Sequence, residues 1–85
     1  KPRMICRNQN IEQVAEKLAT YYGVEFHYTE SLKDIVINGK IDLREELESV
    51  LNTIAFTAPV SFEMDGDTVE IHRIATYNNQ LKLNQ

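Results

Sequence analysis

Few residues of this chain could perform acid–base chemistry, and their contexts favour structural roles. His27 and His72 are its two histidines, and each falls on the polar side of an alternating stretch. A general base needs an orienting carboxylate and a pocket for its substrate, and the sequence demonstrates neither for these histidines. We therefore predict two surface histidines. A small enzyme or ligand carrier that uses His27 or His72 stays open as an alternative.

The acidic residues also lack the spacing of a metal or catalytic site. Glu45, Glu46 and Glu48 crowd one segment, and a solvated helix face accounts for them. The sequence Asp65-Gly66-Asp67 resembles the start of a calcium loop but lacks the remaining ligands, so it predicts a tight turn. These patterns favour surface positions and turns.

The remaining candidates are a cysteine and a glycine-containing segment. Cys6 is the one cysteine, so it cannot form an internal disulfide, and we predict a small apolar strand residue. The segment Asn38-Gly39-Lys40 lacks the glycine pattern of a phosphate loop and predicts a turn or bulge. Taken together, the sequence predicts no catalytic residue, no metal site, no cofactor and no enzymatic activity.

Length and charge narrow the class of protein. A chain of 85 residues predicts one small domain, which buries only a modest core. A net charge of −4 argues against nucleic-acid binding, which usually needs a basic surface. No run approaches the ~18 apolar residues of a membrane span. Because the sequence opens on Lys1-Pro2-Arg3 without an initiator methionine, we expect a piece of a longer protein.

In the first half, the sequence predicts a strand, a capped helix and a second strand. The apolar run Met4–Cys6 predicts a strand that Asn8–Asn10 breaks. Asn10 is a suitable N-cap, with Gln13 at the reciprocal position of a capping box. The helix that follows, over residues 11–22, ends at Gly23, a residue suited to the left-handed conformation. Alternation over residues 24–28 then predicts a half-buried strand.

In the second half, a strand leads to a second helix and a hairpin. Leu32 is predicted to anchor a polar connection, and Ile35–Ile37 forms the next strand. Asp42 and Glu45 are predicted to cap a helix that continues to Ala55. Alternating runs over residues 60–64 and 68–72 flank the Asp-Gly turn and predict a β-hairpin. The order is therefore β-α-β-β-α-β-β, in a domain over residues 1–72, with an extended or partly disordered tail over 73–85.

Five segments carry a resemblance to a known family. They are Asn10–Leu18, Tyr21–Phe26, Ile37–Ile41, Leu47–Ile54 and Gly66–Ile71. Together they resemble the C-terminal domain of FecR-type anti-sigma factors of Bacteroidetes, over roughly positions 4 to 72 of the chain. The pattern is also similar to the short N-terminal domain of secretins and TonB-dependent receptors. The resemblance implies an α+β fold in which two helices pack with two small sheets.

The resemblance also implies a place in cell-surface signalling. The chain would be the periplasmic domain of a single-span inner-membrane anti-sigma factor, with no direct membrane contact of its own. It would bind the N-terminal signalling domain of an outer-membrane TonB-dependent transducer. A segment N-terminal to this domain would bind an extracytoplasmic-function sigma factor and so regulate transcription. The alternative is that the chain is itself the N-terminal signalling domain of a TonB-dependent receptor or secretin.

Strand edges suggest where a partner would bind. Small sheets expose unpaired backbone groups on their outer strands, and a partner strand can pair with them. We therefore predict a binding site at exposed strand positions, with one aromatic contact from the first helix. The predicted partner-binding residues are Tyr21, Glu25, His27, Glu63, Glu70 and His72.

Overall fold

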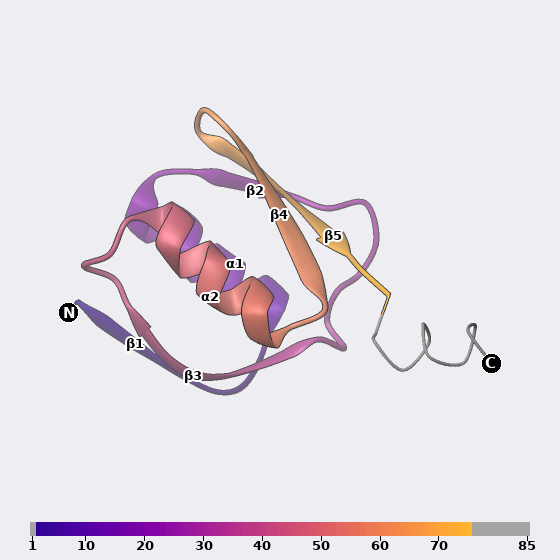
Figure 1. Ribbon diagram of the computed structural model, residues 1–85, viewed down its shortest axis with the longest axis horizontal. Helices are drawn as coiled ribbons and strands as arrows, with labels where there is room; N and C mark the ends of the chain where they lie inside the picture. The colour runs from indigo at the N-terminus through magenta and orange to yellow at the C-terminus, as the bar shows by residue number, and fades with distance from the viewer. Residues whose placement is uncertain (1, 76–85) are drawn as a thin grey trace.

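The computed structural model describes residues 2–75, and its elements follow the predicted order (Figure 1). They are β1 (Arg3–Asn10), α1 (Ile11–Tyr22), β2 (Glu25–His27), β3 (Val36–Asp42), α2 (Leu47–Thr57), β4 (Val60–Asp65) and β5 (Thr68–Arg73). This confirms the α+β class and the β-α-β-β-α-β-β order. The two helices lie between two small sheets, and each helix contacts strands of both sheets (Figure 1).

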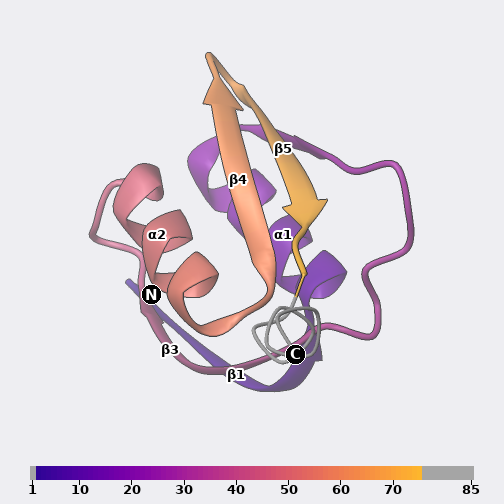
Figure 2. The same cartoon turned by 45° about the vertical axis from the view of Figure 1, so that its right-hand side comes forward.

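The two sheets differ in size and in strand direction. In the smaller sheet, β1 and β3 pair in antiparallel fashion. The larger sheet has the order β2-β5-β4, in which β5 runs parallel to β2 and antiparallel to β4. Strand β5 is therefore central, and its backbone is paired on both sides. Figure 2 shows β4 and β5 side by side, with the pair β1 and β3 below the helices.

Helix α1 begins and ends where the sequence predicts. The Asn10 side chain accepts a hydrogen bond from the Gln13 amide at 2.9 Å, and the Gln13 side chain accepts one from the Asn10 amide at 3.3 Å. This reciprocal pair confirms the capping box. At the other end Gly23 has a φ of 70°, and its N–H donates to the Ala19 carbonyl, as expected of a left-handed C-terminal glycine.

Helix α2 begins later than predicted, and Asp42 does not cap it. The helix starts at Leu47, and Glu46 stands at the N-cap without a side-chain hydrogen bond. Asp42 is instead the last residue of β3. Its carboxylate accepts hydrogen bonds from the amide and the guanidinium of Arg44, at 2.9–3.0 Å. A short acidic side chain that binds the backbone two residues ahead stabilises a turn in competition with a helix.

A second contact explains why the segment after Asp42 stays out of the helix. The Tyr22 hydroxyl lies 2.7 Å from the Glu45 carbonyl and 3.3 Å from the Leu43 carbonyl. This side chain comes from the last turn of α1, so it could not be paired with these carbonyls from the sequence. The hydroxyl fixes the link between β3 and α2 in a non-helical path, and the predicted Asp42–Glu45 capping box is wrong.

Strands β1 and β3 are longer than predicted. Residues 8–10, predicted to break the first strand, continue β1, and residues 38–40, predicted as a turn or bulge, continue β3. Cross-strand pairing, which no local pattern reveals, keeps both segments extended. The pairing includes a bulge, but it lies on β1, where two residues between Cys6 and Gln9 oppose the single Asn38.

The bulge is stabilised by two asparagine side chains. Asn8 has a φ of 51°, a conformation that asparagine tolerates better than most residues. Its amide donates to the side-chain oxygen of Asn38 at 2.8 Å, and the Asn38 side-chain amide donates back to the Asn8 side-chain oxygen at 3.3 Å. These two bonds replace the ladder bonds that the bulge interrupts.

One apolar core lies between the sheets and the helices. Within residues 2–75 no polar or charged residue is buried. Leu32 is fully buried although it lies in an irregular loop, which confirms it as an anchor. Cys6 is a buried strand residue, as predicted, and burial raises the pKa of its thiol.

The C-terminal hairpin forms as predicted, and its last residue contacts the loop before β3. Register pairs Asp65 with Thr68, so Gly66 and Asp67 make a two-residue loop. Arg73, which we assigned to the tail, ends β5 and donates to the Asp34 carboxylate at 2.8 and 3.0 Å. The predicted tail beyond position 75 lies outside the residues that the structure describes.

The Asp42–Arg44 pair predicts an acid-sensitive contribution to stability. Hydrogen bonds from the Arg44 side chain, and then from its amide, lower the pKa of Asp42 from 3.8 to about 2. A carboxylate with a lowered pKa stabilises the folded state above its unfolded pKa, and this contribution is lost as pH falls through the folded value. We expect an NMR titration of the Asp42 carboxyl carbon to show its inflection near 2. An inflection near 3.8 would contradict the pairing.

Candidate partner-binding face

Five of the six predicted partner-binding residues lie on one exposed face. In the three-stranded sheet, Val69 and Ile71 face the core, so the residues that alternate with them face outward. Register pairs His27 with Glu70 and Glu70 with Glu63, which places one side chain from each strand in a row. We call this surface the outer face. Its predicted partner-binding residues, all exposed, are Glu25, His27, Glu63, Glu70 and His72.

The strand order changes how this face can be used. The edge strands of this sheet are β2 and β4, so only their backbones could pair with a strand of a partner. These two strands carry Glu25, His27 and Glu63. Glu70 and His72 lie on the central strand, whose backbone groups are already paired, so only their side chains can meet a partner. A partner would therefore contact the outer face mainly through side chains, while strand addition is restricted to β2 or β4.

The outer face is acidic. Its outward positions are Glu25, His27, Ser61, Glu63, Asp65, Thr68, Glu70 and His72. Four of these eight residues are carboxylates and none is lysine or arginine. Positive charge at these positions can come only from the two histidines, when they are protonated. The face is therefore complementary to a cation or to a basic surface.

The histidines of the outer face each contact nearby carboxylates. The His72 Nε2 atom lies 3.2 Å from a Glu70 carboxylate oxygen and 3.6 Å from a Glu63 carboxylate oxygen. The His27 Nε2 atom lies 3.4 Å from a carboxylate oxygen of Glu25. All five side chains are at least half exposed, so these contacts add little to folding stability.

Tyr21 lies away from the outer face. It belongs to the last turn of α1, its side chain is about half exposed, and its ring packs edge-on against Tyr22 at 5.0 Å between ring centres. It borders a shallow hollow near the start of β1, together with Arg3, Met4, Glu16, Lys17, Thr20 and Leu43. The structure therefore does not bring Tyr21 together with the other five predicted residues.

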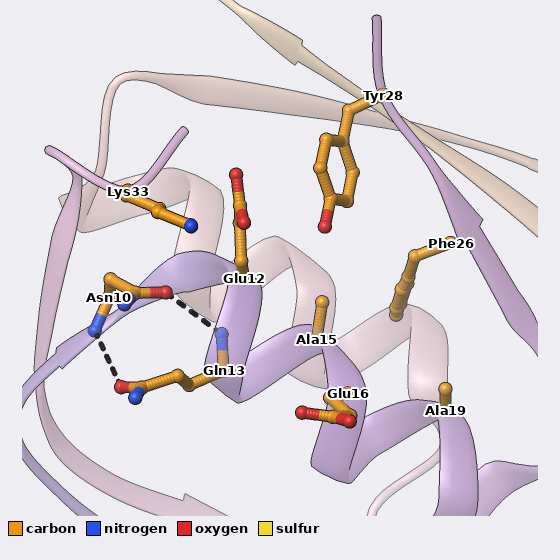
Figure 3. Close-up of a pocket in the computed structure, with 9 residues that line it drawn as sticks. All are labelled: Asn10, Glu12, Gln13, Ala15, Glu16, Ala19, Phe26, Tyr28 and Lys33. Atoms are coloured by element: carbon orange, nitrogen blue, oxygen red, sulfur yellow. Dashed lines mark hydrogen bonds between the residues drawn. The ribbon is translucent and has the colours of Figure 1, made fainter. Parts of the chain in front are cut away.

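A groove along α1 was not predicted from the sequence (Figure 3). It has a volume of about 600 Å³ and is lined by Asn10, Glu12, Gln13, Ala15, Glu16, Ala19, Phe26, Tyr28 and Lys33. Ala15 and Ala19 leave space along the helix, and the Tyr28 ring stands opposite with its hydroxyl directed toward the helix (Figure 3). Burial, together with the nearby Glu12 and Glu16, raises the pKa of the Tyr28 hydroxyl.

The groove has a structural role that involves Glu12. The Glu12 carboxylate accepts a hydrogen bond from the Leu32 amide at 2.8 Å, which ties the loop after β2 to the first turn of α1. The only sequence signal for the groove is the pair of alanines one helical turn apart. That signal is equally typical of a helix packed closely against a neighbour.

The fold and the chain's residues match one family. The family model described as "FecR, C-terminal" matches residues 3–71, which is most of the chain. The chain belongs to the FecR C-terminal family. This confirms the resemblance that the sequence motifs indicated. No curated protein matches this FecR C-terminal domain in sequence.

Solved structures agree on the fold of the FecR C-terminal domain. Two crystal structures of a protein from Parabacteroides distasonis ATCC 8503, assigned as an anti-sigma factor, each match with a TM-score of 0.74. Sequence identity is 20%, at which the likeness shows the fold alone. The match covers 86% of the present chain and 34% of each matched chain. The present domain thus spans about a third of the length of those proteins.

Family membership gives the FecR C-terminal domain a role in signalling. The family match supports a regulatory role, and the exposed polar side chains of the outer face suit contact with another macromolecule. Neither helix described within residues 2–75 is long and apolar enough to cross a membrane.

Proposed function

We propose that this FecR C-terminal domain is the periplasmic interaction domain of an anti-sigma factor. It receives a signal from an outer-membrane TonB-dependent transducer and relays it to an extracytoplasmic-function sigma factor. The observation that carries this proposal is the family match over residues 3–71. The same match favours the anti-sigma factor over the N-terminal domain of a receptor or secretin.

The proposed contact surface is the outer face. Its five residues stand on a hydrogen-bonded sheet, so their positions are fixed before a partner arrives, which lowers the entropy lost on binding. The excess of carboxylates favours a basic patch on the N-terminal signalling domain of the transducer. Tyr21 lies apart and would be reached only by a partner that extends along α1.

The remaining steps of the relay belong to parts of the protein outside this domain. The sigma factor would bind a segment N-terminal to the domain, connected to it by a single span of the inner membrane. The matched chains from Parabacteroides are about three times longer than the part that aligns, which is consistent with additional segments. In this arrangement the present domain contributes binding and no catalysis.

Calorimetry against the N-terminal signalling domain of a TonB-dependent receptor encoded beside this protein tests the proposal. We expect saturable one-to-one binding. Replacing both Glu63 and Glu70 with lysine should weaken the affinity at least about tenfold, or about 1.4 kcal/mol, because it reverses two charges at the centre of the face.

A control variant separates this surface from general charge effects. Glu45→Lys with Glu48→Lys makes the same charge change at exposed positions near the start of α2. This variant should keep the affinity of the unmodified chain. Equal losses in both variants would show that the outer face is not the contact surface. No binding at high concentration would contradict the proposed transducer.

A further inference from the structure

Three donor atoms on the outer face are arranged as metal ligands. One donor atom each from Glu63, Glu70 and His72 lies within 4.8 Å of the other two. Glu63 and Glu70 are directly opposite each other on β4 and β5, and His72 follows two residues along β5 on the same face. The register of the hairpin therefore places all three side chains next to one another on this face.

Two of the three donor–donor distances are close to the spacing that zinc requires. Zinc binds imidazole nitrogen and carboxylate oxygen at about 2.0–2.2 Å, so two ligands at a tetrahedral angle lie roughly 3.3–3.5 Å apart. The His72 Nε2 atom lies 3.2 Å from a Glu70 oxygen and 3.6 Å from a Glu63 oxygen. The carboxylate oxygens of Glu63 and Glu70 lie within 4.8 Å of each other, so rotation of these exposed side chains would bring all three donors to the spacing of zinc ligands.

The electrostatics of the hairpin favour a cation at this place. Like charges directly opposite each other on antiparallel strands destabilise the pair, and Glu63 and Glu70 are such a pair. No lysine or arginine stands among the outward positions of the described sheet to offset them. A divalent ion would neutralise both carboxylates and would use the neutral form of His72.

We propose that Glu63, Glu70 and His72 form a surface site for Zn²⁺ or a similar transition-metal ion. The imidazole and the low number of ligands disfavour Ca²⁺, which takes six to eight oxygens, and Mg²⁺, which requires octahedral oxygen ligands. Three protein ligands leave a fourth position open for water or for a donor from a partner. The site stands on its own geometry and does not depend on the identity of the signalling partner.

Zinc titration of the chain, by calorimetry near pH 7.5 in a buffer that does not chelate metals, tests the site. Metal ions bind the deprotonated forms of their ligands, so binding is measured above neutral pH. We expect saturation at one ion per chain, with no competition from excess Mg²⁺. In NMR spectra the ring signals of His72 should shift on titration by much more than those of His27, which stands beside Glu70 and is not a ligand. The chain contains no other histidine, so the two rings can be distinguished by substitution.

Two alanine variants give a matched comparison. His72→Ala removes a ligand and should weaken zinc binding at least tenfold, because loss of an outer-shell partner alone typically costs about 10- to 100-fold. His27→Ala removes the other exposed histidine of the same face and should leave the affinity within about twofold, since it is not a ligand. Equal affinities in the two variants, or no saturable binding at millimolar zinc, would overturn the proposal.

Discussion

Replacing Leu32 with alanine is expected to lower the free energy of unfolding by about 2–5 kcal/mol. The Leu32 side chain is fully buried among core residues, although it belongs to a loop of polar sequence. Alanine would leave a cavity in the core. Because small domains are stable by only about 5–15 kcal/mol, this loss is a large fraction of the total. Chemical denaturation of the variant and the unmodified chain measures the difference.

The backbone of Leu32 makes hydrogen bonds that this substitution does not remove. The Leu32 amide donates to the Glu12 carboxylate, and the Leu32 carbonyl accepts from the Ile35 amide at 3.0 Å. Both bonds use backbone atoms of Leu32, so they survive its change to alanine. The predicted loss therefore reports the burial of the side chain, and not the loss of these hydrogen bonds.

Phe56→Ala is the control for this prediction. Phe56 is a larger apolar residue, but its side chain is 90% exposed near the end of α2. Its replacement should change stability by no more than about 0.5 kcal/mol. If Leu32→Ala proved as mild as Phe56→Ala, the loop would not be anchored as the structure shows.

Local signals predicted the elements whose stabilising contacts are themselves local. The two ends of α1 are stabilised by Asn10 and Gln13 at its start and by Gly23 at its end. Each of these residues bonds to atoms of the same helix, so its role could be predicted from neighbouring residues. The hairpin could be predicted in the same way, because a two-residue loop at Gly66 and Asp67 fixes its register. From that register Glu63 falls opposite Glu70, a consequence that the spacing of the two residues alone did not suggest.

Most of the failed predictions depend on residues far apart in the chain. Asp42 satisfies the usual requirements of an N-cap, but Tyr22, about 20 positions earlier, holds the segment that would have been the first turn of the helix. The extended form of residues 8–10 and 38–40 depends on pairing across about 30 positions. The central position of β5, which decides how Glu70 and His72 can meet a partner, is likewise a property of the assembled sheet.

Gly39 gives the sharpest test of the β1–β3 pairing that sequence reasoning did not foresee. It lies in β3 opposite Cys6 and has a φ of +131°, which is outside the left-handed helical region that asparagine tolerates. A Cβ atom at this position would meet nothing within 4 Å, so any cost of substitution comes from backbone strain and not from a clash. Gly39→Asn should therefore lower the free energy of unfolding by about 1–3 kcal/mol.

The same substitution at Gly23 provides the contrast. Gly23 has a φ of +70° at the end of α1, where asparagine is the usual substitute for glycine, so Gly23→Asn should cost less than about 1 kcal/mol. Because the strain at Gly39 belongs to the backbone, Gly39→Ala should cost about as much as Gly39→Asn. Equal costs for asparagine at the two glycines would mean that β3 relaxes at position 39, and that the register with β1 is not fixed by this residue.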